Sequence, residues 1–228
     1  MSEAPWQAGG FSEWLRQTRV AHQTDTAVDV PCGDCVACCT SSYFIHIRPD
    51  ETATLSRVPP ELLVPAPDAP RGHFVMGYDQ RGKCPMLEEG RCSIYEDRPL
   101  TCRTYDCRVF AAAGIEADRP AITARARTWA FECATDDERC AQVAVRAAAR
   151  FLRAHPDCFV GGAQPDNPAH LALLAAKVYE VFLVGKDKCG APARAASHAG
   201  ADAETAAAVI AVAEAFEAGR VRPDGCGT

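Results

Sequence analysis

The spacing of apolar positions changes along the chain near residue 108. Before it, apolar runs are short, and SSYFIHI at 41–47 and HFVMGYD at 73–79 have the β-branched and aromatic content of strands. The segment 58–72 holds five prolines, so we expect an extended loop there. The Glu-Glu-Gly sequence at 88–90 predicts the turn of a hairpin. This part of the chain therefore predicts short strands joined by loops.

Beyond residue 108 the chain is rich in alanine, which favours helices, and a further helix is predicted near the N-terminus. The N-terminal helix covers 11–23, with Ser12 as its N-cap. A Thr-x-x-Glu capping box at 135–138 opens a second helix. Asn-Pro at 167–168 opens a third, which Gly185 should end, and a fourth runs over about 202–219.

These elements predict an α+β fold. We expect a small, irregular cysteine-rich unit of short strands, which is stabilised by bound metal and packs on an Ala-rich helical half. The predicted divisions are a leader helix and connector at 1–30, the cysteine unit at 31–110 and the helical half at 111–228. A strand predicted within 122–131 would return to the cysteine unit, so the helices should not form a separate domain.

Composition and charge argue against several classes of protein. Apolar residues make up 48% and charged residues 24%, the balance of a folded globular protein, and the net charge is −6. Nucleic-acid binding needs a concentrated basic face, so we expect no nucleic-acid partner. The N-terminus lacks the features of a signal peptide, and no apolar run approaches the roughly 20 residues of a membrane span. We therefore expect a cytoplasmic protein without membrane association.

The cysteine content is the abnormal feature, because the chain holds 13 cysteines. Clustered thiols in a reducing compartment are typical of metal ligands or redox groups rather than of disulfides. The candidate metal ligands are the eight cysteines of the first half: Cys32, Cys35, Cys38, Cys39, Cys84, Cys92, Cys102 and Cys107.

The first four candidates have the spacing Cys-x2-Cys-x2-Cys-Cys, and two-residue spacers let a tight loop direct several sulfurs toward one point. Cys32, Cys35 and Cys38 match the start of a bacterial ferredoxin run, and Cys84, which precedes a proline, could supply a remote fourth ligand. Adjacent sulfurs do not easily reach one ion. Either one of Cys38 and Cys39 is therefore spare, or the eight thiols serve two metals or one cluster with a helper. We expect an iron–sulfur cluster of the 4Fe–4S type, with Zn²⁺ as the alternative.

Four arginines, at positions 91, 98, 103 and 108, are interleaved with the later cysteines. Guanidinium groups beside a thiolate site would offset its negative charge and lower the pKa of the thiols. The alternative is that the arginines form surface ion pairs with Glu96, Asp97 and Asp106. The sequence leaves both interpretations open.

Other candidates are interpreted as structural. We expect His46 to be hydrogen-bonded rather than a metal ligand, and Tyr95 and Tyr105 to pack around the site. The remaining cysteines should be small buried side chains or incidental loop residues: Cys133, Cys140, Cys158, Cys189 and Cys226.

CGDCVACC at 32–39 and CPMLEEGRCSIYEDRPLTCRTYDC at 84–107 together resemble the YkgJ-like cysteine cluster family, also described as the CxxCxxCC zinc- or iron-chelating domain. The resemblance covers roughly residues 30–110 and implies metal binding by the eight cysteines. Many members of the family are described as iron–sulfur oxidoreductases. The flagellin lysine methylases share a similar cysteine pattern, which adds an enzymatic role by analogy.

We therefore expect a metal-binding protein whose iron–sulfur centre has a redox or cluster-dependent catalytic role. The alternative is a zinc protein in which the metal is structural and the chain is an interaction module. A protein partner or a protein substrate suits either function. The chain contains no nucleophile elbow, P-loop, HExxH or dinucleotide fingerprint, so the corresponding activities lack support.

Overall fold

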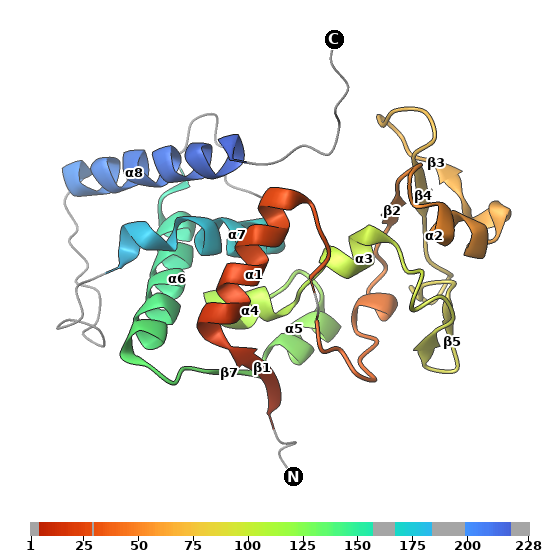
Figure 1. The fold of residues 1–228 in the computed structure, drawn as a ribbon, viewed down its shortest axis with the longest axis horizontal. Coiled ribbons are helices and arrows are strands. Elements are labelled where there is room, and N and C mark those ends of the chain that lie inside the picture. The colour runs from red at the N-terminus through yellow and green to blue at the C-terminus, as the bar shows by residue number, and fades with distance from the viewer. Residues whose placement is uncertain (1–4, 29, 157–166, 184–198, 220–228) are drawn as a thin grey trace. The chain divides into compact units, whose positions relative to one another are not determined.

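The computed structural model describes residues 5–28, 30–156, 167–183 and 199–219 (Figure 1). Its contacts divide the chain into two compact units. The helical unit comprises 1–25, 107–118 and 126–228, and the cysteine unit comprises 26–106 and 119–125. Each unit is assembled from separate stretches of sequence, whereas the sequence predicted three consecutive segments. The mixture of helices and small sheets confirms the α+β class.

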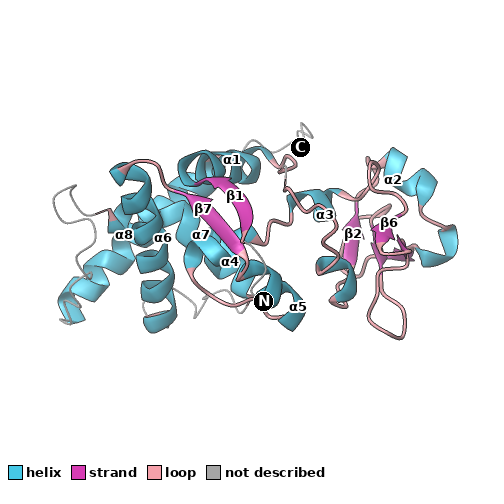
Figure 2. Ribbon diagram, turned by 90° about the horizontal axis from the view of Figure 1, so that it is seen from below, coloured by secondary structure: helices cyan, strands magenta, loops and turns pink. Residues whose placement is uncertain are grey.

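The helical unit combines helices with a two-stranded parallel sheet. Figure 2 shows its two strands side by side, and the pairing places Trp6 opposite Trp129. None of the helices in the described part of the chain is long and apolar enough to cross a membrane. The elements are β1 (Trp6–Gly10), α1 (Phe11–Thr24), α4 (Arg108–Ala113), β7 (Trp129–Glu132), α6 (Asp136–Ala154), α7 (Pro168–Val178), the 3-10 turn η5 (Tyr179–Phe182) and α8 (Ala199–Ala218).

The N-terminal helix is confirmed, but its predicted N-cap is wrong. The chain passes directly from β1 into α1, and the N-cap is Gly10, which makes no side-chain hydrogen bond. Ser12 therefore lies inside the helix. Tertiary pairing of β1 with β7 decides where the helix begins, because it extends the preceding backbone up to Gly10. Phe11 is then fully buried, with its ring 5.2 Å from that of Phe131.

The predicted capping box of α6 is confirmed. The Thr135 hydroxyl accepts a hydrogen bond from the Glu138 N–H at 3.2 Å, and the Glu138 carboxylate accepts one from the Thr135 N–H at 3.1 Å. In α7 the Asn167 side chain accepts from the Ala169 N–H at 2.8 Å, so the predicted start of this helix is also confirmed. Gly185, the predicted end of the third helix, lies outside the described residues.

Alanine and aliphatic side chains form the core of the helical unit. Ala148, Ala149 and Val145 on α6 are fully buried, as are Ala172 and Ala175 on α7. Helices α6 and α7 contact each other, and small side chains at their interface allow close packing. The alanine-rich composition therefore supplies both helix propensity and the packing surface.

The cysteine unit contains only short elements. Strands β2, β4 and β3 form an antiparallel sheet in that order, and β5 and β6 form a separate hairpin. The elements are η1 (Cys38–Thr40), β2 (Ile45–Ile47), α2 (Thr52–Arg57), η2 (Pro60–Leu62), β3 (Val64–Pro65), β4 (Phe74–Met76), β5 (Leu87–Glu88), β6 (Arg91–Cys92), α3 (Leu100–Thr104) and residues 120–125 of α5 (Pro120–Ala126).

Several predictions for this unit hold and two are wrong. The strands predicted within 41–47 and 73–79 are confirmed, at β2 and β4. The segment 58–72 is not a plain loop: it includes a 3-10 turn with Pro60 at its start, and β3, which pairs with one side of β4. Within 122–131 only Trp129–Glu132 is a strand, and it pairs with β1 of the helical unit. The part of 122–131 that belongs to the cysteine unit is helical.

The core of the cysteine unit is small. One buried apolar cluster of the unit consists of Ile47, Val58, Met76, Met86 and Ile94. Val28, Val30 and Ile122 are also buried. Cys84 and Cys92 pack against this cluster with several partly buried apolar residues. Two of the predicted ligands therefore lie at the edge of the apolar core of the unit.

Candidate metal centre

The β5–β6 hairpin brings three of the predicted ligands together. Glu89 and Gly90 both have positive φ, the conformation that a two-residue hairpin turn requires, so the predicted turn is confirmed. Cys92 lies opposite Leu87, whose N–H donates a hydrogen bond to the Cys84 carbonyl at 3.0 Å. The Cys84 N–H donates to the Cys39 carbonyl at 2.7 Å. A backbone contact thus joins the two cysteine groups that the sequence separates.

The thiols of Cys39 and Cys102 are strongly perturbed. Burial is the main cause that raises the pKa of Cys39 to about 12, and the thiolates of Cys84 and Cys92 raise it further. Burial likewise raises the pKa of Cys102 to about 12, with added repulsion from Cys39, Cys84 and Cys92. Burial and Cys92 also raise the pKa of Cys84, against a hydrogen bond from the Met86 backbone that lowers it.

These interactions link every pair within one group of four thiols: Cys39, Cys84, Cys92 and Cys102. Each pair contributes to the raised pKa of Cys39, Cys84 or Cys102, so the four sulfurs lie within mutual electrostatic range. We call this group the four-thiol set.

Cys32 and Cys35 lie next to each other on the loop before η1. The Cys35 N–H donates a hydrogen bond to the Cys32 carbonyl at 2.9 Å. Burial, Cys35 and Asp106 raise the pKa of Cys32, whereas Arg98 and Arg125 lower it. Both thiols also contribute to the raised pKa of Cys39. The start of the Cys-x2-Cys-x2-Cys-Cys run is therefore electrostatically linked to the four-thiol set.

The two other predicted ligands have different surroundings. Cys38 is the first residue of η1 and is partly buried. Cys107 belongs to the helical unit, where it is buried directly before α4. The Trp129 indole N–H donates a hydrogen bond to the Cys107 sulfur at 3.2 Å.

The donor chemistry of the cysteine unit fits a soft metal. Thiolate sulfur is the preferred ligand of zinc and of iron–sulfur clusters, whereas Mg²⁺ and Ca²⁺ require oxygen. As the side chains are placed, the described residues contain no group of three or more His, Cys, Asp or Glu that could hold a metal ion.

Arginines contribute to the site in different ways. Arg98 lowers the pKa of both Cys32 and Cys102, which supports the charge-offsetting interpretation for this residue. Its guanidinium lies 3.9 Å from the centre of the Tyr95 ring and donates to the Tyr95 carbonyl at 2.7 Å. Arg108 is instead buried in the helical unit, where it donates to the Ala8 carbonyl at 3.1 Å.

His46 is hydrogen-bonded, as predicted. Its Nε2 lies 3.0 Å from the Nδ1 of His73, and the two rings are stacked with their centres 5.0 Å apart. In the β2–β4 pair His46 lies opposite Val75, so His73 is its diagonal neighbour on the same face. The pairing with His73 joins two strands and has no signal in the sequence.

Two described cysteines, Cys133 and Cys140, are not among the eight candidate ligands, and their surroundings differ. Cys133 is a partly exposed thiol whose sulfur lies 3.9 Å from the Gln142 side-chain oxygen. Cys140 is buried on α6 and is disulfide-bonded, so the expectation of simple packing is wrong for this residue. The other three, Cys158, Cys189 and Cys226, lie outside the described residues.

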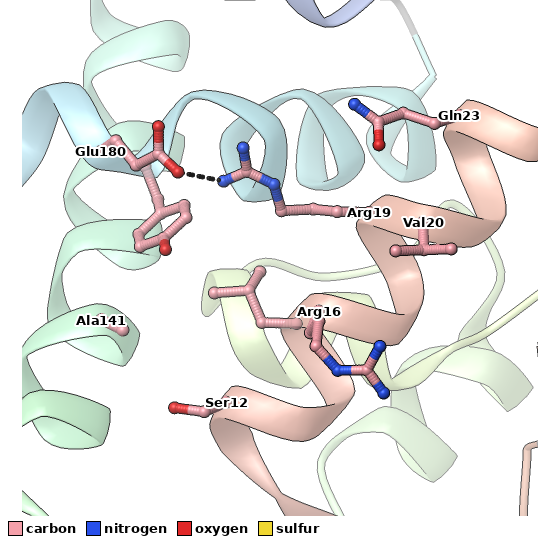
Figure 3. Close-up of a pocket in the computed structure, with 9 residues that line it drawn as sticks. Ser12, Arg16, Arg19, Val20, Gln23, Ala141 and Glu180 are labelled. Atoms are coloured by element: carbon pink, nitrogen blue, oxygen red, sulfur yellow. Dashed lines mark hydrogen bonds and ion pairs between the residues drawn. The ribbon is translucent and has the colours of Figure 1, made fainter. Parts of the chain in front are cut away.

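A pocket of about 290 Å³ lies in the helical unit (Figure 3). None of the eight candidate cysteines is among its lining residues. Arg16 and Arg19 of α1 line it, with Tyr179 and Glu180 of η5. Arg19 donates to the Glu180 carboxylate at 2.8 Å, and Arg16 pairs with Glu13 at 2.6 Å. Both cations of the pocket are therefore neutralised by acids of the same unit.

Residues 31–141 match the model of the family CxxCxxCC, described as "Putative zinc- or iron-chelating domain". The predicted resemblance is confirmed, and this segment belongs to that family. The match extends beyond the second cysteine group into α6. Comparison with curated proteins and with solved structures found no match. The family match supports metal binding by the chain.

Proposed function

We propose that this CxxCxxCC domain holds an iron–sulfur cluster through the four-thiol set and uses it in a redox or cluster-dependent catalytic role. The observation that carries the proposal is the backbone contact that joins the two cysteine groups: the Cys84 N–H donates to the Cys39 carbonyl at 2.7 Å, beside the hairpin that carries Cys92. The mutual influence of the four thiols on their pKa values agrees with this grouping. Four cysteine sulfurs are the usual ligand set of such a cluster, and one of the four, Cys84, precedes a proline as in ferredoxins. When bound, the cluster would supply one-electron transfer.

The residues of the chain prepare the site for thiolate ligation. Raised pKa values keep Cys39 and Cys102 protonated at neutral pH, so metal binding must displace their protons. Arg98 opposes this protonation at Cys102 and at Cys32, because its positive charge favours the thiolates. Cys32 and Cys35 then provide two further sulfurs beside the four.

A structural zinc site is the second candidate, and the size of the core favours it. The buried apolar cluster beside the thiols has five members, and Cys84 and Cys92 pack directly against it. A Zn²⁺ ion bound by the same four thiols would therefore contribute folding free energy where apolar burial contributes little. In that case the chain would be an interaction module.

A protein partner or protein substrate is part of the proposal. Phe44 is 67% exposed, and its ring packs against the half-exposed Tyr78 at 5.2 Å between ring centres. Exposed aromatic side chains are enriched where proteins contact one another.

The metal content of protein purified without oxygen tests the proposal. Iron and acid-labile sulfide in stoichiometric amounts, with broad visible charge-transfer absorption, would support the cluster. Stoichiometric zinc in a colourless protein would support the second candidate and overturn the first. Absence of both metals, also after reconstitution with each, would overturn metal binding by this domain. Cys133→Ser is the matched control, because it removes a thiol that lies outside the family pattern.

A further inference from the structure

Glu51 is a buried carboxylate of the cysteine unit, with a side chain that is only 6% exposed. One carboxylate oxygen accepts a hydrogen bond from the Leu100 N–H at 2.5 Å, and the other accepts from the Arg48 N–H at 2.7 Å. The Arg103 guanidinium lies 4.0 Å from the first oxygen. Two backbone donors and one cation thus stabilise this buried charge.

The two backbone donors belong to segments that are far apart in the sequence. Arg48 directly follows β2, whereas Leu100 is the first residue of α3. Glu51 therefore joins the end of the central sheet to α3. The connection consists of two short hydrogen bonds, one to each carboxylate oxygen.

Helix α3 carries Cys102, and it is too short to be stable without contacts to other segments. It covers five residues, which in isolation do not form a stable helix. Its second residue, Thr101, donates a hydrogen bond to the His46 carbonyl at 2.7 Å. Both residues that precede Cys102 are therefore fixed to the segment 46–51, Leu100 by Glu51 and Thr101 by His46.

We infer that Glu51 is a positioning residue for the metal centre, which holds α3 so that the Cys102 sulfur stays with the other three members of the four-thiol set. The inference rests on the proposed function. Cys102 has no adjacent cysteine that could replace it, so a shift of α3 removes one sulfur from the centre. The sequence contains no motif for this role, because Glu51 and Cys102 are joined only in the fold.

Cobalt titration of the reduced, metal-free full-length chain tests the inference, because thiolate-to-Co²⁺ absorption reports how many sulfurs are bound. We expect Glu51→Ala to weaken Co²⁺ binding about 10- to 100-fold, as loss of a group that orients a ligand typically does. The spectrum of its Co²⁺ complex should resemble that of Cys102→Ser. Glu51→Gln keeps one acceptor oxygen, so its affinity should lie between those of the wild type and Glu51→Ala. Glu61→Gln, which changes an exposed acid of η2, should match the wild type.

The outcomes separate this inference from the proposed function. A wild-type chain that shows no thiolate-to-Co²⁺ absorption would overturn the proposed function itself. A wild type that binds Co²⁺, with Glu51→Ala and Glu51→Gln giving the same spectrum and affinity, would overturn the role of Glu51 alone. Lower stability toward urea with an unchanged Co²⁺ spectrum would also reject it, because that is the result of a merely structural role. If Glu51→Ala fails to fold, the affinity and spectrum of Glu51→Gln decide the question.

Discussion

The two units of the chain are stabilised by different interactions. In the helical unit, helices of different lengths bury large apolar side chains completely, as at Phe110, Leu152 and Val178. In the cysteine unit, the buried apolar cluster that contains Ile47 has five members. Polar contacts also join segments of this unit. Thr54 donates to the Asp97 carbonyl at 2.6 Å, and Glu51 accepts from two backbone N–H groups.

The difference follows from how each sequence segment is used. Alanine and leucine on a helix supply propensity and core together, so we expect the helical unit to fold without a ligand. In the cysteine unit, partly buried thiols lie beside the apolar cluster, where a larger core would require aliphatic side chains. Its stability should therefore depend on what the thiols bind, and five measurements test this difference between the units.

Metal removal should produce the largest effect. With chelator and reductant present, we expect residues 30–106 to lose most of their protection from hydrogen exchange, because metal-binding free energy is folding free energy for such a unit. The α6 and α7 helices should keep theirs. Equal protection of residues 30–106 with and without metal, measured by mass spectrometry, would contradict a metal-organised cysteine unit.

Loss of a single ligand should come next. Cys39→Ser, Cys84→Ser, Cys92→Ser and Cys102→Ser should each weaken metal binding by more than the roughly 100-fold typical of residues that only orient a ligand. Cys38→Ser should retain much of its metal, since adjacent sulfurs do not easily share one centre. Metal-to-protein ratios of anaerobic samples measure this, with Cys133→Ser as the control. Full occupancy in Cys102→Ser would show that the four-thiol set is assigned incorrectly.

Substitutions that create a cavity should affect metal content differently in the helical unit and in the cysteine unit. Leu152→Ala in the helical unit should lower the free energy of unfolding by about 2–5 kcal/mol and leave the metal content unchanged. Ile47→Ala removes a fully buried side chain of the cysteine unit, and it should reduce both stability and metal affinity. Urea titration with metal analysis distinguishes them. Equal metal loss in both variants would argue that the units are not energetically distinct.

The α6 capping box should contribute a smaller amount. Thr135→Ala removes the hydroxyl that accepts from the Glu138 N–H, which should cost about 1 kcal/mol of unfolding free energy. Thr135→Ser keeps the acceptor and serves as the control. A destabilised Thr135→Ser with a neutral Thr135→Ala would contradict the capping role. Metal content should not change in either variant.

The His46–His73 pair should add the smallest effect, a dependence of stability on pH. Burial, then His73 and Arg48, lower the pKa of His46, against a raising influence of Glu51. The unfolded chain therefore binds more protons, so this contribution is complete above the ordinary histidine pKa of about 6.5 and is lost as pH falls below it. Urea midpoints at pH 7 and pH 5 should differ less in His46→Gln than in the wild type. An equal difference in both proteins would exclude His46 as the titrating group.

Features set by neighbouring residues could be predicted from the sequence. The capping box at Thr135, the hairpin turn at Glu89 and Gly90, and the two spaced cysteine groups all depend on local spacing, and the structure contains the first two as predicted. The family pattern lies in the same local spacing, which is why 32–39 and 84–107 identified it. The N-cap at Ser12 failed because a distant strand, β7, extends the backbone before α1.

The tertiary structure alone decides which of the candidate cysteines are neighbours. Spacing grouped Cys32, Cys35 and Cys38 with Cys84, whereas the fold links Cys39 to Cys84, Cys92 and Cys102 as well as to Cys35 and Cys32. It does so through a backbone contact between Cys39 and Cys84 and through a carboxylate, Glu51, that reaches α3 across 49 positions of sequence. Such contacts join residues whose separation along the chain carries no periodic signal, so only the folded backbone determines which sulfurs meet.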